Sequence, residues 1–234
     1  MDFDTYAYGL WPEVAFNVLL FGLFVVGFLR PARKREWRSM GLVTAFLVAL
    51  FTEMYGFPLT IYILGSILGH SYPALNPFSH KNGHLVTVLL GGSIGAWALV
   101  MMVSNGLILA GLIIMGRGWR KIHRARGALV TDGIYGTVRH PQYAGLWVLV
   151  LGFLIQWPTI ATVLMAPGLL VMYYRLARRE EAELEAVFGD EYRRYKKLVP
   201  AFLPLGRLPV AAEHRESGRV SPDFHAALRG DRKP

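Results

Sequence analysis

Long apolar runs alternate with short basic segments along the chain. Five apolar runs stand out, at about residues 10–29, 40–68, 85–115, 143–156 and 159–174. A helix needs about 20 residues to cross the hydrocarbon core of a bilayer, so the first three runs are long enough. The last two are shorter and are joined only by Trp157-Pro158, which predicts a tight helical hairpin. We therefore predict an all-α, polytopic membrane bundle of about five transmembrane helices.

The basic residues fall on one side of these predicted spans. With five spans, 24 of the 25 Lys and Arg residues face the same side, and Lys81 is the exception. Cytoplasmic segments of membrane proteins carry this excess, so we place the N-terminus outside and the C-terminus in the cytoplasm. We attribute the net charge of +9 to this topology and to anionic lipid head groups, and we expect no nucleic-acid partner. A bacterial inner membrane is the expected location.

The composition changes at about residue 204. We expect residues 1–204 to form the membrane domain and residues 205–234 to form a basic, disordered cytoplasmic tail, because the tail has few large apolar residues. The chain has no cysteine, which excludes disulfides, thiolate metal sites and cysteine nucleophiles.

Glu53 is an ionisable residue well inside the second apolar run. Such a residue is a candidate functional group in a membrane protein. Gly56 and Pro58 follow it closely, so the alternative is a helix break that exposes Glu53 to water or uses it as a cap. Both readings stay open, and we assign no role to Glu53.

Three histidines, His70, His80 and His84, precede the third run. The last two have the i, i+4 spacing that a metal site on a helix can use. Asn82-Gly83 between them favours a turn instead, and no carboxylate lies nearby in the sequence. We therefore expect no metal.

Residues with ionisable side chains, which can take part in catalysis, are concentrated at the predicted cytoplasmic ends of the hairpin. Pro141 marks the start of the fourth span, because proline is well tolerated in the first turn of a helix, and Arg139-His140 come just before it. The returning arm ends in a basic and acidic group: Arg175, Arg178, Arg179, Glu180 and Glu181. We predict that the hairpin brings these ends into one pocket, with His140, Arg139, Arg175, Glu180 and Glu181 as candidate catalytic residues.

A purely structural reading of the same residues remains open. Arginines at a membrane boundary bind lipid phosphates, and R-R-E-E-A-E-L-E can form a solvated helix face with i, i+3 and i, i+4 ion pairs. The basic and aromatic segment at residues 188–204 is amphipathic, which predicts that it lies in the membrane interface and closes the pocket from below.

The C-terminal third carries a series of motifs over residues 129–204: L-V-T-D-G-I-Y-G-T-V-R-H-P-Q-Y-A-G, then the hairpin, then E-E, then G-D-E-Y-R-R-Y-K-K-L-V-P-A-F-L-P. In these motifs the chain resembles the isoprenylcysteine carboxyl methyltransferase and phospholipid methyltransferase superfamily. Ile134 replaces the proline of many relatives. Leu176 occupies the position of the arginine that orients the substrate carboxylate in prenylcysteine enzymes, and this departure argues against carboxylate chemistry.

This resemblance implies that S-adenosylmethionine binds at the cytoplasmic pocket formed by residues 129–204. By motif position, the contacts would come from the backbone near Leu129 and Val130, from several residues around the start of the fourth span, and from the acidic doublet. The full set is Leu129, Val130, Tyr135, His140, Pro141, Tyr143, Gly145, Glu180 and Glu181.

The function that we expect is methyl transfer to a lipophilic or small acceptor: a prenylcysteine-type carboxylate, a phospholipid amine or a thiol. Membrane lipids are the other expected partners. Two alternatives stay open. One is a sterol-reductase-like oxidoreductase that uses NADPH, although Pro141 and Gln142 disfavour its R-H-x-N-Y-style motif. The other is a lipid-binding membrane protein without catalytic activity.

Overall fold

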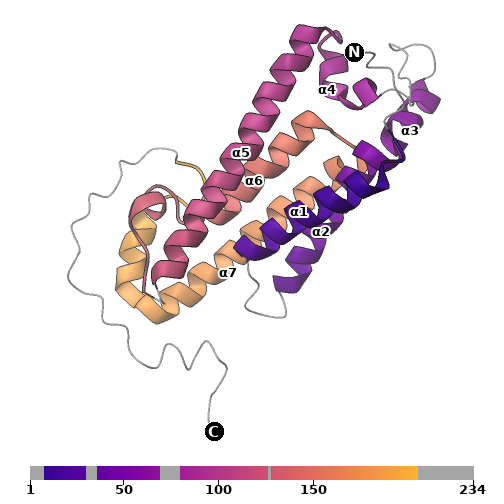
Figure 1. The fold of residues 1–234 in the computed structure, drawn as a ribbon. Helices are drawn as coiled ribbons and strands as arrows, with labels where there is room; N and C mark the ends of the chain where they lie inside the picture. Colours follow the sequence, from indigo (N-terminus) through magenta and orange to yellow (C-terminus); the bar gives the residue numbers. More distant parts are fainter. Residues whose placement is uncertain (1–7, 30–35, 69–79, 126–127, 205–234) are drawn as a thin grey trace. The chain divides into compact units, whose positions relative to one another are not determined.

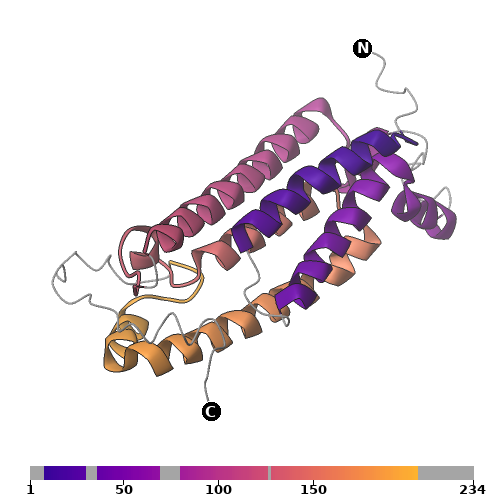
Figure 2. The same cartoon turned by 60° about the horizontal axis from the view of Figure 1, so that its bottom comes forward.

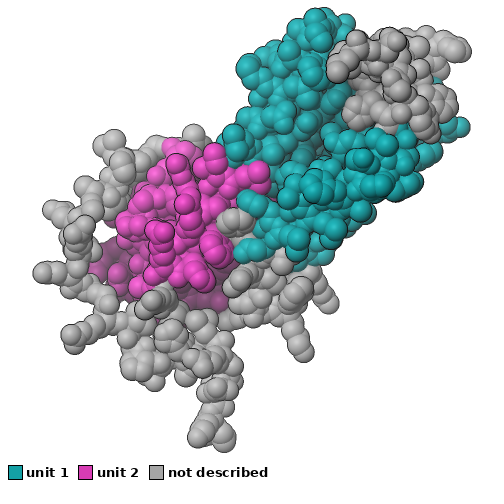
Figure 3. Space-filling view, in the orientation of Figure 1, with its two compact units in different colours: residues 1–111, 147–173 teal, residues 112–146, 174–234 magenta. Residues whose placement is uncertain are grey.

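The computed structural model describes residues 8–29, 36–68, 80–125 and 128–204. The predicted tail and His70 lie outside the described residues, as does the side chain of His80. The chain falls into two compact units, drawn in different colours in Figure 3. Unit 1 comprises residues 1–111 and 147–173, and unit 2 comprises residues 112–146 and 174–234.

Helices make up the regular structure, and the described residues contain no strand. Figures 1 and 2 show the helices from two directions. They are α1 (Trp11–Leu29), α2 (Glu36–Phe51), α3 (Leu59–Leu68), α4 (Leu85–Leu89), α5 (Ile94–Ala125), α6 (Pro141–Gln156) and α7 (Ile160–Leu198). The predicted all-α class is confirmed.

Fewer helices than predicted meet the requirements of a complete membrane span. By length and composition, α5 and α7 can cross a membrane, and the bent pair Met40–Gly56 and Leu59–Ile67 makes a third if it counts as one span. The apolar helices at Trp11–Val25 and Pro141–Gln156 are shorter. The described residues therefore support two or three spans, and the five-span topology and its orientation stay predictions.

The second apolar run is a broken helix rather than one continuous span. A π-helical turn at Thr52–Gly56 ends α2, Phe57 is extended with φ −138° and ψ 118°, and α3 then leaves at an angle of 72°. Proline disfavours the helical conformation in the residue before it, so Pro58 explains the extended Phe57 and the break.

Glu53 caps the helix that follows this break. Its side chain is buried, and Oε2 accepts a hydrogen bond of 2.7 Å from the backbone N–H of Thr60, the second residue of α3. The first N–H groups of a helix have no partner within the helix, and a carboxylate near them is also favoured by the helix dipole. The capping alternative for Glu53 is therefore confirmed.

In unit 1, α6 packs closely against α5 and also contributes to an aromatic cluster. A Cβ added at Gly152 of α6 would lie 2.8 Å from Ile108 and 3.0 Å from the backbone oxygen of Ser104 on α5. The rings of Phe21, Phe51 and Phe153 pack together, with centroids 5.2–5.8 Å apart. Gly152 thus permits a close approach of the α6 and α5 backbones that a larger side chain would prevent.

In unit 2, the returning arm of the hairpin is much longer than predicted. Helix α7 has 39 residues and continues past Glu180, with its one non-helical residue at Gly189 (φ 54°, ψ −124°). The predicted short second arm is therefore wrong, because residues 174–188 are good helix formers without proline or glycine. After Gly189, α7 carries Tyr192 and Tyr195, which form a buried cluster with Val199, the residue that follows the helix.

Candidate functional site

All the contacts of the candidate site lie within unit 2. His140 immediately precedes α6, and its carbonyl accepts a hydrogen bond of 3.0 Å from the N–H of Ala144. Pro141 therefore occupies the first position of the helix, as predicted, where a missing N–H removes no bond. This start fixes the backbone of Arg139 and His140 next to the first turn of α6.

Arg139 connects three segments of unit 2. Its Nε and Nη2 donate to Oε1 of Glu181, at 3.0 and 2.6 Å. Its Nη1 donates to the carbonyl oxygens of Lys196, at 2.8 Å, and of Val199. The side chain is only 9% exposed, so this guanidinium is a buried charge that is satisfied by one carboxylate and the end of α7.

Glu181 is saturated by cationic groups. Besides Arg139, its Oε1 lies 3.2 Å from Nε2 of His140. Its Oε2 accepts a hydrogen bond of 2.9 Å from Arg178 and lies 3.5 Å from Nζ of Lys196. With a side chain only 1% exposed, Glu181 has no oxygen left for a ligand. Its position indicates a structural role in holding the cluster together.

Glu180, the neighbour of Glu181, has a different environment. Its side chain is 38% exposed, Oε1 accepts a hydrogen bond from the hydroxyl of Tyr143, and Oε2 lies 3.6 Å from Nδ1 of His140. The two nitrogens of His140 therefore face two different carboxylates, and the imidazole also stacks on the Tyr143 ring at 5.8 Å. Of the two glutamates, Glu180 is the one that a ligand can reach.

The charges in this cluster shift the pKa values of its members, which lie outside the apolar parts of α6 and α7. Burial alone would lower the pKa of His140, but the hydrogen bonds and charges of Glu180 and Glu181 outweigh burial and raise it. Burial would raise the pKa of Glu181, yet the hydrogen bonds and charges of His140 and Arg139 lower it to about 2. The geometry thus favours an imidazolium between two carboxylates.

Residues 199–204, which follow α7, lie against the start of α6. The backbone N–H groups of Arg139 and His140 donate to the carbonyls of Pro200 and Ala201, both at 2.9 Å. The Phe202 ring lies 5.5 Å from the His140 ring and 5.9 Å from that of Tyr174. This segment therefore contacts the Arg139–His140 end of the hairpin, and its position in the membrane interface, closing a pocket from below, stays a prediction.

The other predicted cofactor residues also lie in unit 2, and two of them contact the segment after Gly189. Tyr135 is buried in the 3₁₀ turn Gly133–Gly136, and its carbonyl accepts a hydrogen bond of 2.7 Å from the Tyr195 hydroxyl. Leu129 packs against the buried cluster of Tyr192, Tyr195 and Val199, whereas Val130 is half-buried. Gly145 is buried one turn into α6.

Arg175 is the predicted residue that does not join the cluster. Its side chain is exposed, and among the described residues no ion pair links it to Glu180 or Glu181. Arg178 takes the place that the prediction gave to Arg175, because i, i+3 spacing on α7 brings it to Glu181. The i, i+3 spacing of Arg178 and Glu181 is the one feature of the sequence that could have identified this ion pair. By contrast, Lys196 and Phe202 reach the cluster through the bend at Gly189, which the prediction did not include.

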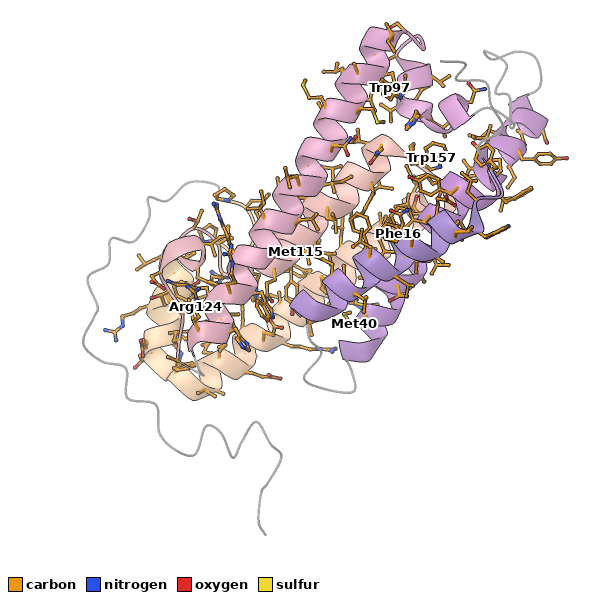
Figure 4. The ribbon with its side chains drawn as sticks, in the orientation of Figure 1. Phe16, Met40, Trp97, Met115, Arg124 and Trp157 are labelled. Atoms are coloured by element: carbon orange, nitrogen blue, oxygen red, sulfur yellow. The ribbon has the colours of Figure 1, made fainter. Side chains whose placement is uncertain are left out.

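Of the three histidines near the third apolar run, His84 is the one whose side chain the structure describes. His84 is buried in unit 1, its Nδ1 lies 2.9 Å from the carbonyl oxygen of Gln156, and its ring meets Trp157 edge-on at 4.9 Å. Figure 4 labels Trp157 and Trp97, the two tryptophans whose rings lie near His84. Among the described residues there is no group of three or more His, Asp or Glu side chains arranged to hold a metal ion.

A family model matches the region that contains Arg139, His140, Tyr143, Glu180 and Glu181. Residues 98–191 match the family model of phospholipid methyltransferases. The protein-S-isoprenylcysteine O-methyltransferase of Schizosaccharomyces pombe is 41% identical over 78 residues, which are 33% of this chain and 33% of that protein. The human protein of the same name is 39% identical over 85 residues, or 32% of this chain and 27% of the relative.

A bacterial relative matches a longer part of the chain. The cobalt-zinc-cadmium resistance protein CzcN of Cupriavidus metallidurans is 30% identical over 126 residues, 51% of this chain and 58% of CzcN. The chain therefore covers less than two thirds of each of these relatives. No solved structure gives a significant match.

Proposed function

Because residues 98–191 belong to the isoprenylcysteine and phospholipid methyltransferase superfamily, we propose that the protein is an integral-membrane methyltransferase that uses S-adenosylmethionine. The acceptor would be lipophilic or small: a prenylcysteine-type carboxylate, a phospholipid amine or a thiol. The observation that carries this proposal is the contact of Arg139, His140 and Tyr143 with Glu180 and Glu181, inside the matched region.

The donor set of the cluster suits this cofactor. S-adenosylmethionine carries an ammonium group, a sulfonium group and ribose hydroxyls, all of which a carboxylate can bind, and Glu180 is accessible. Cations also bind aromatic faces, and Tyr174 and Phe202 lie side by side near His140. The buried Tyr192 hydroxyl has no hydrogen-bond partner among the described residues, and a ligand or a water molecule commonly satisfies such a group.

The contacts of each residue in the cluster suggest whether it would bind the cofactor, position another residue or line the site. Glu180 would bind the cofactor, with Tyr143 fixing its orientation through the hydroxyl. Glu181 and Arg139 would act as positioning residues, since their polar atoms are engaged with each other and with Arg178, Lys196 and the end of α7. Leu129, Val130, Tyr135, Pro141 and Gly145 would line the site through backbone and apolar contacts.

When bound, S-adenosylmethionine would supply an electrophilic methyl group for in-line displacement by the acceptor. The residues of this chain would contribute mainly alignment, which can account for a large part of a rate enhancement. His140, with a raised pKa and a carboxylate at each nitrogen, is a hydrogen-bond donor rather than a free base. If the acceptor is an amine or a thiol, Glu180 is the accessible group that can take its proton.

We also place this site at the cytoplasmic face of a membrane, and in a bacterium at the inner membrane. The support is the basic excess on one side of the predicted spans. Residues 1–204 would form the membrane domain, with the cofactor-binding part at residues 129–204.

Calorimetric titration of the purified protein with S-adenosylhomocysteine tests the proposal. Glu180→Gln removes the accessible charge, and we expect the affinity to fall at least ten-fold. Glu183→Gln, an exposed change on the same helix, is the matched control and should bind as the wild type does. Equal affinity of Glu180→Gln and wild type would refute the assignment. If NADPH raises the melting temperature and S-adenosylhomocysteine does not, the oxidoreductase alternative replaces this proposal.

A further inference from the structure

A basic pocket lies at the C-terminal end of α5, within unit 2. It has a volume of about 240 Å³ and is lined by Arg117, Arg120, Lys121, Arg124 and Ile134. The four cations have the spacing i, i+3, i+4, i+7, so they share one face of the helix. Arg124, labelled in Figure 4, lies on the last turn of α5.

Carboxylates of the described residues compensate only part of this positive charge. Lys121 forms an ion pair of 2.6 Å with Asp132, and Nε of Arg120 donates to the carbonyl of Gly116 at 3.4 Å. Within the described part of the chain, no carboxylate pairs with Arg117, Arg120 or Arg124. Like charges on one helix face repel each other, and a bound anion would relieve this repulsion.

A second basic pocket in unit 2 differs from the α5 pocket in how far its cations are paired with carboxylates. It is lined by Glu185, Asp190, Arg193, Arg194, Lys196 and Lys197. There, Arg193 pairs with Glu185 and Asp190, both at 3.0 Å, and Lys196 lies 3.3 Å from Glu185. Within the described residues, carboxylates thus neutralise part of the charge in this second pocket, whereas in the α5 pocket they pair only with Lys121.

We infer that the α5 pocket binds a phosphate group, and that the phosphate belongs to the head group of a membrane lipid. Guanidinium groups match phosphate oxygens in pairs of parallel hydrogen bonds. The surroundings suit a hydrocarbon chain as well: Ile134 lines the pocket, and Ile113, one turn before Arg117 on α5, is 43% exposed. An amphiphile with an anionic head therefore fits better than a fully polar anion.

This site is separate from the candidate methyltransferase cluster, although the two share one turn. Ile134 faces the basic pocket, while the next residue, Tyr135, accepts the hydrogen bond from Tyr195. None of the cations of the α5 pocket contacts Glu180 or Glu181 among the described ion pairs. The inference therefore does not depend on the proposed activity.

The test measures binding to the full-length protein in a neutral detergent by thermophoresis. The probes are dihexanoyl phosphatidic acid, dihexanoyl phosphatidylcholine and inorganic phosphate. The pocket variant combines Arg117→Gln, Arg120→Gln and Arg124→Gln. The control removes the same number of charges from the second pocket through Arg193→Gln, Arg194→Gln and Lys197→Gln. The single variant Arg120→Gln replaces the triple variant if the latter does not fold.

We expect phosphatidic acid to bind wild type at least ten-fold more tightly than the zwitterionic lipid does. Each cation near an anionic surface contributes roughly five-fold to affinity, so the pocket variant should lose at least ten-fold and the control less than two-fold. For the single variant the expected loss is about five-fold. Inorganic phosphate should bind at least ten-fold more weakly than phosphatidic acid. If inorganic phosphate and phosphatidic acid bind equally well, the lipid assignment is wrong and the pocket binds free phosphate.

Two results would overturn the phosphate site altogether. One is equal binding of both lipids to wild type, together with no binding of inorganic phosphate. The other is an equal loss of affinity in the pocket variant and the control, which would mean that net charge alone attracts the anion.

Discussion

Glu180 and Glu181 are adjacent in the sequence, yet they face different surroundings. Glu181 is buried among Arg139, His140, Arg178 and Lys196, whereas Glu180 is 38% exposed. On a helix, neighbouring residues point in directions about 100° apart, so one carboxylate can close a salt-bridge network while the other faces outward. We therefore expect substitutions of these two residues to have separable effects.

Replacing Glu181 with Gln should mainly lower the stability of the folded protein, because Glu181 holds the cluster together and does not contact a ligand. The change leaves the buried guanidinium of Arg139 without its counter-charge, and removing one partner of a buried pair costs about 3–5 kcal/mol. The melting temperature of the purified protein measures this loss. The exposed Glu183→Gln should stay within about 0.5 kcal/mol of wild type. A stable Glu181→Gln protein would contradict the structural role of this residue.

The raised pKa of His140 makes the stability depend on pH. A group whose pKa is higher in the folded state contributes stability that is fully present below its unfolded pKa of about 6.5. This contribution is lost as the pH rises through the raised folded value. Between pH 6 and 9, the melting temperature of wild type should therefore fall more steeply than that of His140→Gln. Parallel curves would show that His140 is not held as an imidazolium.

At this scale, the sequence predicted the main pairing but not its details. The predicted hairpin correctly placed residues 139–143 close to Glu180 and Glu181, because these two segments are the open ends of the two arms that the turn joins. It gave Arg175 a role that Arg178 has, since the helical phase of α7 at the cluster could not be fixed without its contacts. The carbonyls of Lys196 and Val199 were also missed, because backbone acceptors leave no mark in the residue types.

At the level of elements, Gly189 controls where α7 turns toward the cluster. Its φ of 54° lies in the left-handed region, where glycine is tolerated at no steric cost. The residues after it include Lys196 and Val199, whose carbonyls accept bonds from Arg139. The direction of this last part of α7 is therefore set by one backbone conformation.

Gly189→Ala should lower the free energy of unfolding by about 1–3 kcal/mol, the cost of holding a residue with a side chain in a sparsely populated backbone region. It should also weaken the binding of S-adenosylhomocysteine, because the end of α7 supports Arg139. Asparagine tolerates a positive φ mainly when ψ is about +30 to +60°, whereas ψ at Gly189 is −124°. Gly189→Asn should therefore be destabilised about as much as Gly189→Ala in melting and titration experiments. An alanine variant as stable as wild type would refute the role of the bend.

The apolar runs indicated where helices form, whereas the breaks and ends of those helices were predicted only in part: the break near Gly56 and Pro58 was one of two open readings. The run at residues 40–68 is one block in hydropathy, yet Gly56 and Pro58 split it into α2 and α3 with a π-helical turn between them. Conversely, the returning arm of the hairpin was expected to end at about Glu180 and Glu181, but helix propensity carries α7 on to Leu198. Hydropathy measures burial in lipid and says little about where the backbone hydrogen bonds end.

At the scale of the whole molecule, the orientation in the membrane is the prediction that most needs a direct test. The native chain has no cysteine, so single cysteines report their own accessibility. In spheroplasts, an impermeant maleimide should label Asn82→Cys directly, because this position lies in the predicted outer loop. Ser221→Cys in the predicted cytoplasmic tail should react only after permeabilisation. The reverse pattern would contradict the orientation and the cytoplasmic site.

The central claim is that the cluster of Arg139, His140, Tyr143, Glu180 and Glu181 serves methyl transfer. The most direct measurement incubates membranes that contain the protein with S-adenosylmethionine carrying an isotopically labelled methyl group. The account predicts that label enters extractable lipids or small molecules with wild type and with Glu183→Gln, and falls at least ten-fold with Glu180→Gln. Label incorporated equally by wild type and Glu180→Gln, or by none of the three proteins, would contradict it.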